Sequence, residues 1–148
     1  MEELYELRAA LEAGHYEEAL ALLDEMEAMS RDDKIDRIAS FMEVLLLHLI
    51  KQAAEARTAR SWDISMAYAI DRVVRTNKRR KAGGYYLPDE DLQEALDESY
   101  PSALKRAAHE AFEGLYSPEQ LGAMVDRETL LAMALEQILL AHRTEQER

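Results

Sequence analysis

The sequence predicts an all-α fold, a single-domain helical bundle of about six to seven helices over residues 1–148. Three observations lead to this prediction. The strong helix formers Ala, Leu, Glu, Lys and Arg dominate the composition. Only five glycines and three prolines interrupt the chain. Alternating runs of β-branched residues, which would indicate strands, are missing. With 48% hydrophobic residues, a chain of this length can form a core without disulfides or metals.

The first two predicted helices, at about residues 2–13 and 16–29, form an N-terminal helical hairpin. Gly14 suits the C-cap of the first helix. The segment Gly14–Leu20 looks like half of a tetratricopeptide repeat, but no second copy follows at the required period, so we expect one hairpin and no repeat array. In the first helix, Leu4, Leu7 and Leu11 share one face. In the second, the residues expected to point inward are Ala19, Leu20, Leu23 and Met26.

A central apolar helix is predicted from Ser30, as N-cap, to about Ala56. Asp32 and Asp33 would lie at the positive end of its dipole. Between Val44 and Ile50 the helix is apolar on almost every side, which is typical of a helix in the middle of a bundle.

The rest of the chain is predicted to form shorter helices, separated by glycines, prolines and capping residues. Gly83 and Gly84 end the helix that Ser61 is expected to cap, and Tyr85–Pro88 is a loop. The last helix is apolar on most faces, so we expect it to pack beside the central helix. The expected helices are about 62–81 after Ser61, 89–98, 101–114 starting at Pro101, 118–125 after Ser117, and 127–142 after Asp126.

Charge and composition limit the classes of function. The net charge of −12 opposes non-specific binding to nucleic acids or anionic membranes. The absence of cysteine excludes thiol nucleophiles, thiolate metal sites and disulfides. The longest apolar run, Val44–Leu47, is far shorter than the ~20 residues of a membrane span. Because Met1–Glu3 is acidic and lacks the features of a secretory signal, we expect a cytoplasmic protein that does not bind membranes.

The middle of the sequence carries a family resemblance. Val44–Gln52 reads Val-Leu-Leu-Leu-His-Leu-Ile-Lys-Gln and is followed by Arg60-Ser61-Trp62 and then Arg72. Together with Ser117–Leu121, these motifs resemble domain-of-unknown-function family twenty-nine, bacterial all-helical proteins of about this length. The resemblance covers roughly residues 3–140. It implies the helical fold and a cytoplasmic location, and it implies no activity.

The histidines and carboxylates do not indicate a catalytic or metal site. His48, inside the most apolar turn, is interpreted as a neutral core histidine with one hydrogen bond. His109 and Glu113 have the spacing of a metal-binding pair, but a solvated helix face has it too, as for Glu90, Glu94 and Glu98. The four histidines also lack the Glu-x-x-His spacing of di-iron bundles. We therefore predict no catalytic residues, no metal and no cofactor.

A compact group at a predicted helix junction is a first candidate for binding. Arg57 and Arg60 flank the start of a helix, where two guanidinium groups could hold a phosphate or carboxylate, with Trp62 beside them. The structural alternative is that Trp62 fills the core, Ser61 caps the helix, and an arginine pairs with a carboxylate.

The basic stretch Arg72–Lys81 is the second candidate, because it departs most from the acidic average of the chain. It leads into Tyr85 and Tyr86, and a basic stripe followed by aromatic rings could bind a nucleic-acid backbone and stack on bases. It could equally bind an acidic protein, including the Asp89–Glu98 segment of a second copy, or simply complement a helix C-terminus. The basic residues are Arg72, Arg75, Lys78, Arg79, Arg80 and Lys81.

The sequence therefore predicts a non-enzymatic helical adaptor or self-associating module. Association would use exposed apolar residues at an edge of the bundle and the charge contrast between Arg72–Lys81 and Asp89–Glu98. The expected partner is another protein or a second copy of the chain. The alternative is a nucleic-acid-associated protein or toxin–antitoxin component that uses Arg72–Lys81.

Overall fold

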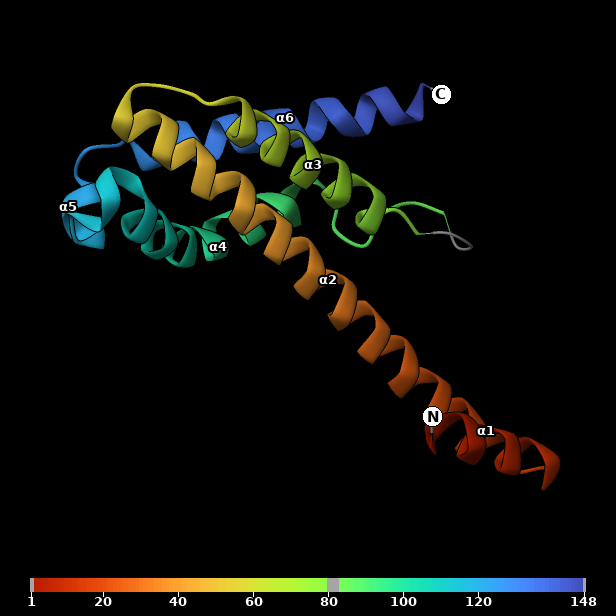
Figure 1. Ribbon diagram of the computed structural model, residues 1–148. Helices are drawn as coiled ribbons and strands as arrows, with labels where there is room; N and C mark the ends of the chain where they lie inside the picture. Colours follow the sequence, from red (N-terminus) through yellow and green to blue (C-terminus); the bar gives the residue numbers. More distant parts are fainter. Residues whose placement is uncertain (1, 80–82, 148) are drawn as a thin grey trace.

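The computed structural model describes residues 2–79 and 83–147, and these residues confirm the all-α prediction (Figure 1). Within them, the only β-type pairing is an isolated antiparallel bridge between Lys78 and Tyr85. The described helices are α1 (Glu2–Glu12), α2 (Tyr16–Glu55), α3 (Arg60–Asn77), α4 (Asp89–Glu110), the short 3-10 helix η1 (Ala111–Gly114), α5 (Pro118–Gly122) and α6 (Arg127–Gln146).

Helix α2 is one continuous helix of 40 residues, where the sequence predicts two. The predicted N-cap at Ser30 is wrong, because the helix passes through it without a break. Residues 30–34 are polar but contain neither glycine nor proline. An existing helix extends through such residues at little cost, since only nucleation is expensive. At 1.5 Å per residue, α2 is roughly 60 Å long.

The second half of α2 forms the centre of the bundle, as the sequence predicts. Residues Leu45–Ile50 are buried, and α3, α4 and α6 all pack against this part of the chain. The prediction that the last helix packs beside the central one is therefore confirmed. Large side chains without exposed surface fill the core: Ile38, Met42, Leu45, Leu46, Ile50, Leu92, Leu96, Leu121 and Ile138.

Helix α1 and the first half of α2 form the predicted N-terminal hairpin, which extends away from the bundle (Figure 1). Gly14 closes α1 with a Schellman motif: its φ is +79°, its amide donates to Leu11 O at 3.2 Å, and the His15 amide donates to Ala10 O at 2.8 Å. The inward orientation predicted for Leu20 and Leu23 is wrong, because both are exposed. Among the described helices, the short α1 packs against this half of α2, and another flank of α2 keeps exposed apolar side chains.

Helix α4 also joins two predicted helices, because Pro101 lies inside it and does not start a new one. A proline lacks the N–H that would bond to the carbonyl four residues earlier, here Asp97 O. The guanidinium of Arg127, at the start of α6, donates to Asp97 O at 3.4 Å. It also lies 4.9 Å from the ring centroid of Tyr100. A residue distant in sequence thus satisfies the carbonyl that Pro101 leaves free.

The junction of α2 and α3 is held by side chains. Gln52 Nε2 donates to Thr58 Oγ1 at 2.7 Å, and that hydroxyl donates to Asp63 Oδ1 at 2.9 Å. The N-cap of α3 is Ala59, so the predicted cap at Ser61 is wrong. The predicted start at Ser117 is confirmed, since Ser117 and Gln120 form a reciprocal capping box.

The loop after α3 is anchored by one buried side chain. Helix α3 ends at Asn77, before the predicted end at Lys81. Asn77 has no exposed surface. Its Nδ2 donates to Leu87 O at 3.0 Å, and the Leu87 amide donates to its Oδ1 at 2.7 Å. The amide of Asn77 therefore pairs both backbone polar groups of Leu87 and fixes the loop against the bundle.

Candidate functional site

A cleft of about 410 Å³ lies where α2 turns into α3, opposite η1. It contains two of the residues that the sequence singles out, Arg57 and Trp62, with acidic and apolar neighbours. The lining residues are Glu55, Arg57, Trp62, Glu110, Phe112, Glu113 and Leu115.

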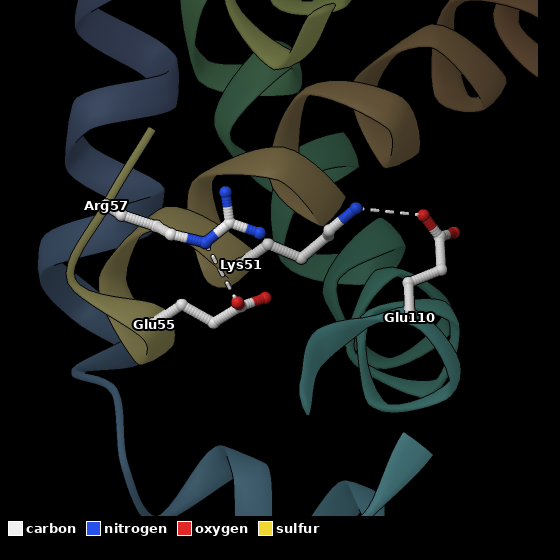
Figure 2. Close-up of polar contacts among 4 residues, drawn as sticks. All are labelled: Lys51, Glu55, Arg57 and Glu110. Carbon is white, nitrogen blue, oxygen red and sulfur yellow. Dashed lines mark hydrogen bonds and ion pairs between the residues drawn. The ribbon is translucent and has the colours of Figure 1, made fainter. Parts of the chain in front are cut away.

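Two ion pairs border this cleft (Figure 2). The Lys51 ammonium lies 3.0 Å from Glu110 Oε1, and Arg57 Nε lies 3.1 Å from Glu55 Oε1. Both cations also contact the indole of Trp62: Lys51 Nζ is 4.5 Å and Arg57 Cζ is 4.4 Å from its ring centroid. A cation near an aromatic ring is stabilised by the ring quadrupole. The indole of Trp62 therefore contacts the cation of each ion pair. Trp62 itself is only partly buried.

The structure brings Arg57 and Trp62 together and leaves Arg60 apart. Arg60 is exposed and is not among the residues that line the cleft. The two arginines of the predicted phosphate or carboxylate site therefore do not meet in this cleft. An anion entering the cleft would have to displace Glu55 from Arg57 or Glu110 from Lys51. The existing carboxylates thus neutralise the cations that an anionic ligand would need.

Lys51 is a buried functional group that the sequence analysis missed. Its side chain is only 7% exposed. The position of Lys51 in the sequence indicates its burial, because it lies four residues after the buried Leu47 and therefore on the same face of α2. Lysine is seldom buried unless paired, and its partner Glu110 is 59 residues away in sequence.

The Lys51–Glu110 pair gives a prediction for stability. Replacing Glu110→Ala leaves a buried ammonium without its carboxylate, so we expect a loss of about 1 kcal/mol, limited because Glu110 is 45% exposed. Replacing Lys51→Met removes the buried charge and keeps the stem, so we expect a change within about 0.5 kcal/mol. Urea denaturation of both variants and the double variant measures these values. A larger loss for Lys51→Met than for Glu110→Ala would contradict this account.

The backbone at the cleft is unusual. Among the described residues, the non-glycine residues with positive φ are Ala56 (+55°), Phe112 (+50°) and Glu113 (+55°). Ala56 forms the C-cap of α2, and the other two lie in η1 and line the cleft. Because the chain leaves α-helical geometry after Glu110, Glu113 does not lie one helical turn beyond His109. The metal-like spacing of His109 and Glu113 is therefore lost in the fold.

The described members of the basic stretch have contacts within the chain. Arg75 pairs with Asp71 at 3.1 Å, and the Lys78 ammonium lies 3.9 Å from Glu145. Arg80 and Lys81 lie outside the described residues. The two remaining arginines contact aromatic rings: Arg72 lies near the rings of Phe41 and Tyr68, and Arg79 near that of Tyr86. Two of the four described basic residues are thus paired with carboxylates.

Arg79, Tyr85 and Tyr86 line one wall of a larger groove of about 870 Å³. The opposite wall is the part of α2 where the hairpin leaves the bundle, including Asp24 and Glu27. The groove therefore mixes cationic, acidic and aromatic side chains, and it is not the uniformly basic track that a nucleic-acid backbone favours.

The buried histidines are not part of a metal cluster. Within residues 2–79 and 83–147, no group of three or more His, Asp or Glu residues is placed to hold a metal ion. Burial lowers the pKa of both His48 and His142, because it disfavours the charged imidazolium. The predicted hydrogen bond of His48 is not made at Nδ1, which is buried without a partner.

His142 gives a prediction for pH dependence. Its Nε2 lies 3.4 Å from Asn77 Nδ2, so protonation of Nε2 would set two donors against each other. Since its folded pKa is lowered, the unfolded chain binds more protons below about pH 6.5. Stability is therefore complete above that pH and falls as pH decreases toward the folded pKa. We expect His142→Gln to lose less stability than the wild type between about pH 7.5 and pH 5.5, as measured by urea denaturation. Equal losses would contradict this assignment.

The hairpin carries an exposed apolar surface, which includes Leu20 and Leu23, two residues predicted to point inward. We define the hairpin surface as its exposed large hydrophobic side chains. The hairpin carries seven of the thirteen exposed large hydrophobic side chains among the described residues, although it comprises only a small part of the chain. They are Leu4, Tyr5, Leu11, Tyr16, Leu20, Leu23 and Met29.

Comparisons with known proteins place the chain in a family. Among the described residues, no helix combines the length and apolar character needed to cross a membrane. No curated protein and no solved structure matches the chain. A family model described as "Domain of unknown function DUF29" matches residues 8–133, which is most of the sequence. The chain therefore belongs to the DUF29 family, as the motifs around Val44–Gln52 indicate.

Proposed function

We propose that the chain is a non-enzymatic helical adaptor that binds a protein partner through the hairpin surface. The observation that carries this proposal is the concentration of exposed apolar side chains on a hairpin that extends from the bundle (Figure 1). Contiguous exposed apolar patches on a protein surface commonly mark interaction sites.

The geometry of the hairpin supports this proposal. Two packed helices can bury only the flanks that face each other, and the buried residues of the hairpin are small, Ala10 and Ala19. Larger side chains such as Tyr16 and Leu20 remain in solvent. A further helix lying along this flank would cover them, as amphipathic helices do in hydrophobic grooves.

The two candidate sites predicted from the sequence differ from the hairpin surface, because many of their charged groups already have partners within the chain. The cations at the cleft pair with Glu55 and Glu110, and described residues of the basic stretch pair with Asp71 and Glu145. Polar groups already satisfied within the chain gain little from a ligand. The apolar side chains of the hairpin have no such compensation, so covering them is favourable at roughly 25 cal/mol per Å².

Site-specific photo-crosslinking in the native host tests this proposal. A photoreactive residue at Leu20, which is 61% exposed, samples the hairpin surface. The same residue at Ile64, which is 59% exposed on α3, is a matched control on the bundle. We expect one adduct of discrete mass from position 20 and none of that mass from position 64. No adduct from position 20, or the same adducts from both positions, would refute the proposal.

A further inference from the structure

Resting on the proposed function, we infer that the partner segment is a basic amphipathic helix, because the hairpin surface combines apolar side chains with dense acidic charge. Residues 2–29 contain nine carboxylates and one arginine, a net charge of −8, whereas the whole chain has −12. Most of the acidic excess of the protein thus lies on the segment that carries the exposed apolar patch.

The few basic groups of the hairpin are engaged within it. Arg8 Nε lies 3.0 Å from Glu12 Oε1, and His15 Nδ1 lies 3.5 Å from Glu18 Oε2. The hairpin therefore presents no unpaired arginine to a partner. A partner with acidic groups beside its apolar face would meet mostly like charge on the hairpin, which opposes association.

Carboxylates border the apolar row of α2 directly. Tyr16, Leu20 and Leu23 follow one another at helical spacing and are exposed. Asp24 and Glu27 lie one turn further along the same face and are also exposed. A helix lying along this row would place its apolar side chains on Leu20 and Leu23 and its flanking residues near these carboxylates. Lysine and arginine suit those flanking positions, since their long stems cover apolar surface while their charges reach the acids.

The same charge distribution argues against a second copy as the occupant. Two hairpins packed face to face would gather eighteen carboxylates and two arginines, twice the content of one hairpin. Such a concentration of one sign of charge opposes a compact assembly. A basic helix covers the same apolar side chains and neutralises the acids around them.

A pair of synthetic peptides tests the inference on the full-length chain. Both are amphipathic helices of roughly 18 residues, long enough to fold when bound, with the same leucine face. The polar face of one carries lysine and arginine, and that of the other carries glutamate. Fluorescence anisotropy of the labelled peptides measures Kd at low and high salt. We expect the basic peptide to bind at least about tenfold more tightly at low salt, and we expect added salt to reduce this difference.

Two variants assign the binding to the hairpin. Leu20→Ser should raise the Kd of the basic peptide by about tenfold. Ile64→Ser, at a matched exposed position, should leave this Kd unchanged. The double variant Asp24→Asn, Glu27→Gln keeps the shape of the surface and removes two charges. It should weaken the binding of the basic peptide severalfold, and it should not weaken the binding of the acidic peptide. Circular dichroism verifies that each variant keeps its helix content.

The outcomes separate this inference from the proposed function. Equal binding of both peptides, or binding of neither, would contradict the inference that the partner is a basic helix. So would a dimer in light scattering that Leu20→Ser disrupts, because the occupant is then a second copy. In the first two cases a discrete photo-crosslink from position 20 would still support an adaptor, whereas an adduct with the mass of two copies of the chain would not. Loss of that crosslink, with tight binding of the basic peptide, would instead contradict the proposed function alone.

Discussion

Replacing Leu46→Ala is expected to lower the free energy of unfolding by about 3 kcal/mol. Leu46 lies in the buried half of α2 and has no exposed surface. Truncation removes its apolar contacts and leaves a cavity among side chains that relax only in part. Urea denaturation followed by circular dichroism measures the change, with the slope of the transition expected to stay constant.

The same substitution elsewhere in the same helix is the control. Leu20→Ala changes an exposed residue of the hairpin half of α2, so we expect a change of no more than about 0.5 kcal/mol. Alanine also has the higher helix propensity, which offsets part of any loss. Comparable losses at Leu46 and Leu20 would mean that the hairpin packs against the rest of the chain in solution, and the proposed docking surface would then not exist.

Replacing Asn77→Ala is expected to cost about 3 kcal/mol, although it removes no large apolar group. The side chain is fully buried and pairs both the N–H and the C=O of Leu87. Its loss leaves two buried backbone groups without partners, at roughly 1–3 kcal/mol each. Thermal and urea unfolding measure this cost, and faster proteolysis of the loop at residues 83–88 should accompany it.

A second hydrogen bond to the same loop provides the comparison. Gln146 Nε2 donates to the Tyr85 hydroxyl at 2.9 Å, but this bond is exposed. Water replaces it when it is lost, so Gln146→Ala should cost less than about 0.5 kcal/mol. If Asn77→Ala were equally mild, water would have to reach Leu87, and the loop would not be anchored as the structure indicates.

The parts of the fold that depend on local patterns are predictable from the sequence. The apolar run Val44–Ile50 can be satisfied only in the middle of a bundle, and the structure buries it there. Ser117 and Gln120 satisfy each other within one turn of helix, so their capping box needs no information from elsewhere.

Features that depend on partners distant in sequence are not predictable in this way. Pro101 indicates a helix start, but α4 continues through it, and the guanidinium of Arg127 donates to the carbonyl that Pro101 leaves free. Leu20 has the spacing of a core residue, yet no pattern in the sequence states whether another helix reaches it. Ser30 and its polar neighbours resemble a cap, but both flanking segments are helical and the helix continues between them.

The candidate site shows the same division. Arg57 and Trp62 are close in sequence, and their association at a helix junction is predictable. Lys51 and Glu110 are brought together only by the packing of α2 against α4. The charge of the hairpin is visible in the sequence, but its significance depends on knowing that the adjacent apolar residues are exposed.

Because α2 is continuous, the number of residues between the hairpin and the bundle determines the direction in which the hairpin points. Each residue of an α-helix turns the chain by about 100° and advances it by 1.5 Å. One residue inserted between Met29 and Ile35 would therefore rotate the hairpin by about a quarter turn around the bundle, and roughly seven residues would restore its direction at a greater distance. A partner that contacts the hairpin alone would not sense such a change, but one that spans hairpin and bundle would lose its register. In this protein, α2 therefore sets both the distance and the direction in which the hairpin extends from the bundle (Figure 1).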